Sequence, residues 1–212
     1  LFGVEDADHT PAHKPAALPM RRADLKALGA RYWRVVALGV VFTLARFSEA
    51  FLILKAHASG LPLALAPLVL VTMNIVYALA AYPAGALSDR LHARGLLLTS
   101  LAALLVADVT LALGDGLVFV FSGIALWGLH MALSQGLLAK LVAEQAPVAL
   151  RGSAFGLFNL TSGVAMLLAS VLAGALWQGF GAATTFWAGA LFALVAALLV
   201  QWLDTGPVSA SP

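Results

Sequence analysis

The hydrophobic residues of this chain gather in six long runs. Each run has roughly 20 mainly apolar residues, the length that a helix needs to cross the hydrocarbon core of a bilayer. We therefore predict an all-α membrane protein with six transmembrane helices. The predicted spans cover residues 33–54, 63–87, 96–113, 117–141, 153–177 and 184–202.

Short polar or glycine-containing turns separate several of the runs, such as "GDG" at 114–116 and "GFGAA" at 179–183. Such residues mark turns between helices, and the short connections predict tightly packed helical hairpins. The chain then divides into three parts. Residues 1–32 form a polar and basic linker, 33–203 the six-helix transmembrane bundle, and 204–212 a short tail.

The composition supports a lipid environment, because 62% of the residues are hydrophobic and only 10% are charged. Soluble domains carry about 25% charged residues. The chain has no cysteine, which excludes disulfides and thiolate metal sites. We expect no metal and no cofactor. The basic residues near the first span are too mixed with other types to indicate a nucleic-acid partner, so the predicted partners are the lipid bilayer and a small-molecule substrate.

The basic residues predict the orientation of the bundle, since cytoplasmic loops of membrane proteins are enriched in Lys and Arg. Six spans put both termini on one side. The basic residues on that side are a cluster at residues 14–34, Arg90, Arg94, Lys140 and Arg151. The other side has only Lys55. We therefore expect both termini and the loops at 88–95 and 142–152 to be cytoplasmic.

A polar knot, "PAGALSDRLHARGLLL" at 83–98, lies between the second and third spans. One interpretation is simple topology control by arginine. The other is a conformational latch, because Asp89, Arg90 and Arg94 fall within about two helical turns of Gly85. Asp89 could accept hydrogen bonds from the unpaired N–H groups of a facing helix N-terminus. Contacts that exist in only one state would bias the equilibrium between states.

The stretch "GALSDRLHAR" resembles the signature loop of the major facilitator superfamily, G-x-x-x-D-R/K-x-G-R-K/R. His92 and Ala93 depart from that pattern, as is typical of the degenerate second copy between the eighth and ninth helices. The matching positions are Gly85, Asp89, Arg90 and Arg94.

Two further stretches resemble the same family in the same order. "FTLARFSEAFLILKA" is similar to the seventh helix of bacterial members, and "APVALRGSAFGLFNL", with Arg151 and Gly152, to the connection between the tenth and eleventh helices. The resemblance covers residues 33–202. It implies two inverted three-helix repeats that make the C-terminal half of a twelve-helix transporter, with the N-terminal six-helix half as a missing partner. It also implies a bacterial inner membrane.

Two charged residues lie near the middle of the first span, where an ionisable group is costly and suggests function. Arg46 and Glu49 are three residues apart, which predicts a shared helical face. The pair could bind an anionic group and exchange a proton, or it could be a structural ion pair. In the resembled family the first, second, fourth and fifth spans of each half line the cavity.

Uncharged polar residues and one histidine extend the candidate site. His130 could exchange a proton near neutral pH or be a satisfied hydrogen-bonding residue, and Gln135 lies at the edge of its face. Asn74 and Asn159 could bind substrate or join helices. Asp108, in a span that is peripheral in the resembled fold, is expected to be structural or near the outer interface.

We therefore predict a secondary active transporter that moves a small solute by alternating access, coupled to protons. The chain has no Gly-Lys-Ser/Thr phosphate-binding loop for ATP-driven transport. One alternative is a non-transporting six-helix scaffold or receptor. A second is an intramembrane hydrolase using Ser162 and His130, but no G-x-S-x-G turn surrounds the serine, and we expect no enzyme.

Overall fold

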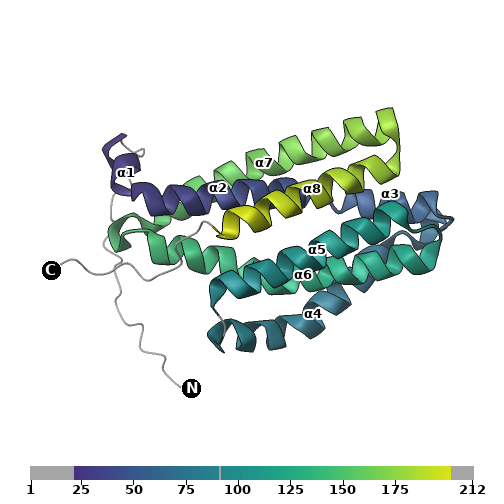
Figure 1. The fold of residues 1–212 in the computed structure, drawn as a ribbon, viewed down its shortest axis with the longest axis horizontal. Helices are drawn as coiled ribbons and strands as arrows, with labels where there is room; N and C mark the ends of the chain where they lie inside the picture. Colours follow the sequence, from purple (N-terminus) through teal and green to yellow (C-terminus); the bar gives the residue numbers. More distant parts are fainter. Residues whose placement is uncertain (1–21, 91, 202–212) are drawn as a thin grey trace, which may run out of the picture.

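The computed structural model describes residues 22–90 and 92–201, and within these ranges the elements are helical (Figure 1). Most of the predicted linker at 1–32 and the predicted tail at 204–212 lie outside the described residues. Two 3-10 turns, Leu63–Leu65 and Val148–Leu150, precede α4 and α7. The α-helices are α1 (Arg22–Ala27), α2 (Gly29–Ala45), α3 (Ala50–Ala58), α4 (Pro67–Arg90), α5 (Ala93–Leu113), α6 (Leu117–Gln145), α7 (Arg151–Phe180) and α8 (Ala182–Gln201).

Within the described residues, six stretches are long and apolar enough to cross a membrane, which confirms the predicted number of spans. Most of them run past their predicted ends, because hydropathy marks the hydrocarbon core of about 30 Å, whereas a bilayer with its interfaces is about 40–45 Å thick. The six stretches are Gly29–Ala58, Leu63–Ser88, Ala93–Leu113, Leu117–Gln145, Val148–Phe180 and Ala182–Gln201.

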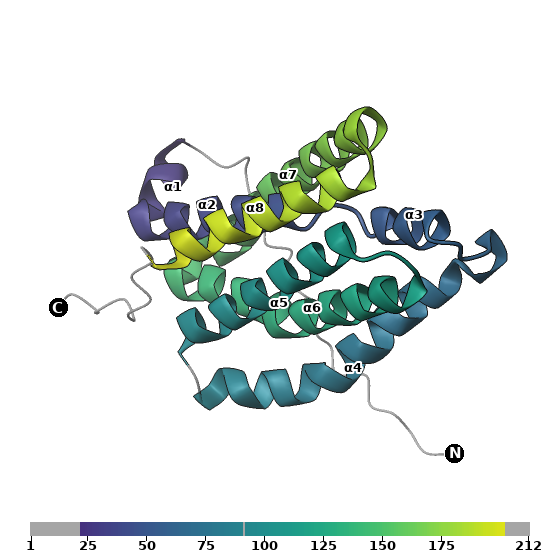
Figure 2. The ribbon, with the colours of Figure 1, turned by 45° about the vertical axis from the view of Figure 1, so that its right-hand side comes forward.

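The helices pack as two related sets of three spans. α5 lies between α6 and α8, while α4 packs on α6 and α7 packs on α2 (Figures 1 and 2). Exchanging the first three spans with the last three reproduces this pattern, since α5 on α6 corresponds to α8 on α2. The contacts thus agree with the two three-helix repeats expected from the sequence.

The first span is not one continuous helix, because α2 ends at Ala45 and α3 begins at Ala50. The backbone N–H of Arg46 donates to the Thr43 carbonyl at 3.1 Å, which closes the end of α2 with a tighter turn. The Ser48 hydroxyl accepts the Ala50 N–H at 3.3 Å and so satisfies a backbone donor at the start of α3. The shared helical face predicted for Arg46 and Glu49 is therefore wrong, since no helix connects them.

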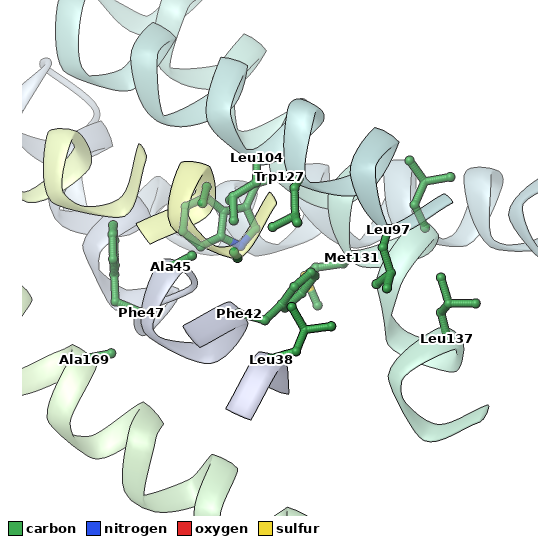
Figure 3. Close-up of a cluster of buried hydrophobic side chains, with 14 of the residues drawn as sticks. Leu38, Phe42, Ala45, Phe47, Leu97, Leu104, Trp127, Met131, Leu137 and Ala169 are labelled. Carbon is green, nitrogen blue, oxygen red and sulfur yellow. The ribbon is translucent and has the colours of Figure 1, made fainter. Parts of the chain in front are cut away.

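The core lies where this break meets α5, α6 and α8. Trp127 of α6 is fully buried, and its ring centroid lies 5.4 Å from that of Phe47, in the break. Figure 3 shows Trp127 beside Leu104, with Phe42 and Met131 continuing the core between α2 and α6 (Figure 3). Packing is close enough that Gly128 lies against the Met73 carbonyl of α4.

The two flanking helices, α4 and α7, bury little of their surface within this chain. On α4, Leu79 is 73% exposed and Tyr82 is 86% exposed, and on α7 Leu160 is 65% exposed. These helices lie on opposite sides of the bundle in both views (Figures 1 and 2). Their exposed faces are apolar, as expected for surfaces that meet lipid or another transmembrane segment.

Candidate functional site

Arg46 and Glu49 lie at the two ends of the break in the first span, and both are half-buried. Their charges interact, and the charge of Arg46 also reaches His130 on α6. Breaks in membrane helices place free backbone groups and polar side chains at membrane depth, where transporters bind ions and substrates. The break therefore brings three of the predicted site residues, Arg46, Glu49 and His130, near one another. The sequence had predicted a shared helical face for Arg46 and Glu49 and had not predicted this break.

His130 is fully buried and is held by Ser100 of α5. Its Nδ1 lies 2.8 Å from the Ser100 carbonyl oxygen and 2.9 Å from the Ser100 hydroxyl. Because a carbonyl oxygen only accepts, Nδ1 carries the proton of the neutral ring and donates it. The imidazole stacks on Phe42 of α2 with ring centroids 5.1 Å apart. His130 thus joins α5, α6 and α2 in the interior of the bundle.

The other ring nitrogen of His130, Nε2, is buried and has no hydrogen-bond partner among the residues that the structure describes. One ring nitrogen is thus satisfied, as the structural interpretation expects, and proton exchange by this histidine stays a prediction. Unsatisfied buried polar atoms are uncommon in native proteins and call for an explanation. A neutral imidazole with an unused acceptor could take up a proton or accept a hydrogen bond in another conformation.

Three predicted site residues lie on exposed surfaces instead. Asn74 of α4 and Asn159 of α7 are on the two opposite flanks of the bundle, so they do not form one site within this chain. Asn74 donates through Nδ2 to the Leu70 carbonyl of its own helix at 2.7 Å. Gln135 lines a cavity of about 230 Å³ between α4 and α6, together with Tyr77.

The predicted latch residues gather at one end of the bundle, where α4 and α6 end and α5 and α7 begin (Figure 1). Gly85 borders the same cavity as Gln135, and a Cβ placed on it would meet no atom within 4 Å. Arg94 is exposed in the first turn of α5, and Arg151 and Gly152 are exposed at the start of α7. Asp89 and Arg90 are in the last turn of α4, but their side chains lie outside the described part of the chain.

Residues 35–212 match the family model described as Major Facilitator Superfamily. The chain belongs to the major facilitator superfamily. A search of the curated proteins found no match. Members of this superfamily are transporters, and the chain has six helices apolar enough to cross a membrane. It is therefore an integral membrane protein of a transporter family.

Sequence reasoning missed Phe47 at the centre of this superfamily member and did not indicate the position of Asp108. Phe47 joins an aromatic cluster through ring contacts with Phe51, Trp127 and Phe186, at centroid distances of 5.4 to 5.7 Å. Asp108 was expected to be structural or near the outer interface, and the structure shows it fully buried against α8, a position that the sequence did not indicate. An aspartate inside a run such as "LLVADVTLAL" was the only available signal, and it does not say which way the side chain points.

Proposed function

We propose that the chain is the C-terminal half of a secondary active transporter that moves a small solute by alternating access, coupled to protons. The observation that carries the proposal is the break at Arg46–Glu49, which puts the guanidinium of Arg46 within electrostatic reach of the Glu49 carboxylate and of the His130 imidazole inside the bundle. Arg46 would bind an anionic group of the substrate, and Glu49 would take up and release the proton.

The exposed apolar faces of α4 and α7 support an N-terminal six-helix half as the missing partner. Such a half would cover both flanks and bring Asn74, Gln135 and Asn159 to a shared cavity between the halves, where transporters of this architecture bind substrate. The end that carries Arg94 and Arg151 would face the cytoplasm of a bacterial inner membrane, with both termini, in line with the positive-inside rule.

At the same end, Gly85, Asp89, Arg90 and Arg94 would form the latch against a helix N-terminus of the other half. Arg151 and Gly152, at the start of α7, would receive the equivalent loop of that half. The exposed position of Arg94, Arg151 and Gly152 supports this role, because these residues are available to a partner.

A scaffold without transport is the second candidate, and the charged groups in the break argue against it, because charges at membrane depth without a role are costly. The hydrolase alternative is not favoured. His130 Nδ1 is engaged with Ser100, and the buried hydroxyl of Ser162 on α7 has no hydrogen-bond partner in the structure. A nucleophilic serine needs a base within hydrogen-bond reach.

The test is transport by the full-length protein in sealed vesicles. Small organic anions and zwitterions, each in labelled form, are offered with and without an imposed pH gradient. We expect at least one of them to accumulate only with the gradient and to exchange without it. Gradient-independent exchange alone would reject proton coupling, and the absence of any movement across this set would favour the scaffold.

A further inference from the structure

Asp108 lies in the fifth turn of α5 with no exposed surface, and both of its carboxyl oxygens are buried without a hydrogen-bond partner among the described residues. It faces Gly189 of α8. A Cβ built on that glycine would lie 2.7 Å from Asp108 Oδ2 and 3.0 Å from Cε1 of Phe47. The carboxyl group therefore occupies space that only a glycine leaves open, beside the break in the first span.

An ionised carboxylate in this place would be a buried charge without compensation, which is far more costly than a neutral carboxyl. α8 carries no titratable side chain. Among the described residues, no titratable side chain on α5 or on the elements around Asp108 hydrogen-bonds to it. Those side chains are Arg94 on α5 itself, His130, Lys140 and Glu144 on α6, Arg46 and Glu49 in the break, Lys55 on α3, and Tyr77 and Tyr82 on α4, whereas the side chains of Asp89 and Arg90 at the end of α4 lie outside the described part of the chain.

We propose that Asp108 is a proton-binding site in the interior of the bundle. It holds a proton in the conformation described here. It releases the proton to water, leaving a carboxylate, when the segment around Phe47 or the neighbouring α8 moves and admits solvent. The role of this proton in the protein rests on the proposed transport function. The proton site itself rests on the geometry of Asp108, Gly189 and Phe47.

The chemistry favours a proton over a metal cation. A cation such as Ca²⁺ or Mg²⁺ needs about six oxygen ligands. No group of three His, Asp or Glu side chains that could hold a metal occurs in the part of the chain that the structure describes. A Cβ built on Gly189 would meet both the Asp108 carboxyl and the ring of Phe47, and neither a glycine without a side chain nor a phenyl ring supplies a side-chain oxygen ligand. A single proton on one oxygen needs no further ligand.

The experiment is infrared difference spectroscopy of the purified full-length protein in lipid, between mildly acidic and mildly alkaline buffer. The C=O stretch of a protonated carboxyl reports its protonation directly and needs no substrate. We expect the wild-type difference spectrum to contain such a band, and expect Asp108→Asn to remove it while Glu49→Gln leaves it in place. Persistence of every band in Asp108→Asn, or an Asp108 band that does not change with pH, would overturn the proposal.

A second variant keeps the test decisive even where Asp108→Asn does not fold. Gly189→Ala would press on Oδ2, so it should shift the midpoint of the same band without removing it. The matched control is Gly163→Ala on α7, where the added Cβ meets no atom within 4 Å, and it should leave the midpoint unchanged. Equal midpoints in both alanine variants would contradict the assignment.

A repeat of the pH titration with choline in place of sodium distinguishes a proton site from a sodium site. A band that changes with pH equally in both salts supports a proton site, whereas a change that requires sodium would replace it by a cation site. Because none of these readouts measures transport, a failure of the transport proposal would leave this result standing, and the reverse also holds.

Discussion

Ser100 and His130 join α5 to α6 through two contacts of one ring nitrogen, Nδ1, at 2.8 Å from the serine carbonyl and 2.9 Å from its hydroxyl. The Ser100 hydroxyl also donates to the His130 carbonyl at 3.3 Å. The side chain of each residue therefore contacts the backbone carbonyl of the other. This connection orients the imidazole and leaves Nε2 pointing into the core without a partner. It is a buried polar contact between the two repeats.

Ser100→Ala should weaken this connection only slightly, because the bond from Nδ1 to the Ser100 carbonyl remains. We expect a loss of about 0.6 kcal/mol in the free energy of unfolding, typical of interhelical hydrogen bonds in membranes. His130→Ala should cost about 2–5 kcal/mol, because it removes both contacts and leaves a cavity. Denaturant unfolding in mixed micelles measures both, with Ser122→Ala on the exposed side of α6 as the control. Equal losses for the two variants would show that the ring contributes nothing.

Single and double neutral variants of Arg46 and Glu49 distinguish a packing role of this pair from a role in transport. If the charges serve only packing, Arg46→Gln or Glu49→Gln should lower the yield of folded full-length protein, and the double variant should restore much of it, because no orphan charge remains. We expect instead that the double variant folds and does not transport, and that Glu49→Gln abolishes proton-driven accumulation while sparing exchange.

Uptake in vesicles with and without a pH gradient, normalised to folded protein, gives the answer for this pair. The control is the double variant Lys140→Gln with Glu144→Gln at the exposed end of α6, which should transport normally. Normal pH-dependent transport by the Arg46 and Glu49 double variant would assign the pair to structure alone and make His130 the next candidate.

Gly128 should tolerate no side chain, because a Cβ there would collide with the Met73 carbonyl on the backbone of α4. We expect Gly128→Ala to lower the free energy of unfolding by about 1–3 kcal/mol, as for overpacked cores. Gly163→Ala, at an open helical position, should be neutral or stabilising by up to about 1 kcal/mol. Thermal unfolding of the two variants side by side tests the close approach of α4 and α6.

The orientation can be read with single cysteines, since the chain itself has none. Any cysteine elsewhere in the full-length protein is replaced first. We expect Ser59→Cys, in the turn after α3, to react with a membrane-impermeant maleimide from outside the cell, and Ala149→Cys, between α6 and α7, to react only after the membrane is opened. The reverse pattern would invert the proposed topology.

Asp89→Asn should slow cycling more than it affects folding, because it removes a contact made in only one conformation. The measurement is exchange of labelled solute by full-length protein in vesicles at equal amounts of folded protein. Asp115→Asn is a matched control, since Asp115 lies exposed in the turn at the opposite end of the bundle. Equal exchange rates in Asp89→Asn and wild type would remove the latch role.

Much of the fold could be predicted because hydropathy is a property of each residue and needs no knowledge of neighbours. The six spans follow from runs of apolar residues that match the thickness of a bilayer. The gathering of the basic residues at one end follows from counting spans. The polar residues in those runs, such as Arg46 and His130, were also recognisable as candidates, because charge at membrane depth is rare and costly.

Only the tertiary structure decided where those side chains point and where the first span breaks. The segment "ARFSEA" contains no glycine or proline, so its break depends on packing of Phe47 among Trp127 and Phe186 and on the hydrogen bond that the Ser48 hydroxyl accepts from the Ala50 N–H. An apolar helix in lipid has no polar face that marks its inner side. For that reason the sequence alone determined that Asp108 lies in a span, and the packing of α5 on α8 decided that it faces Gly189.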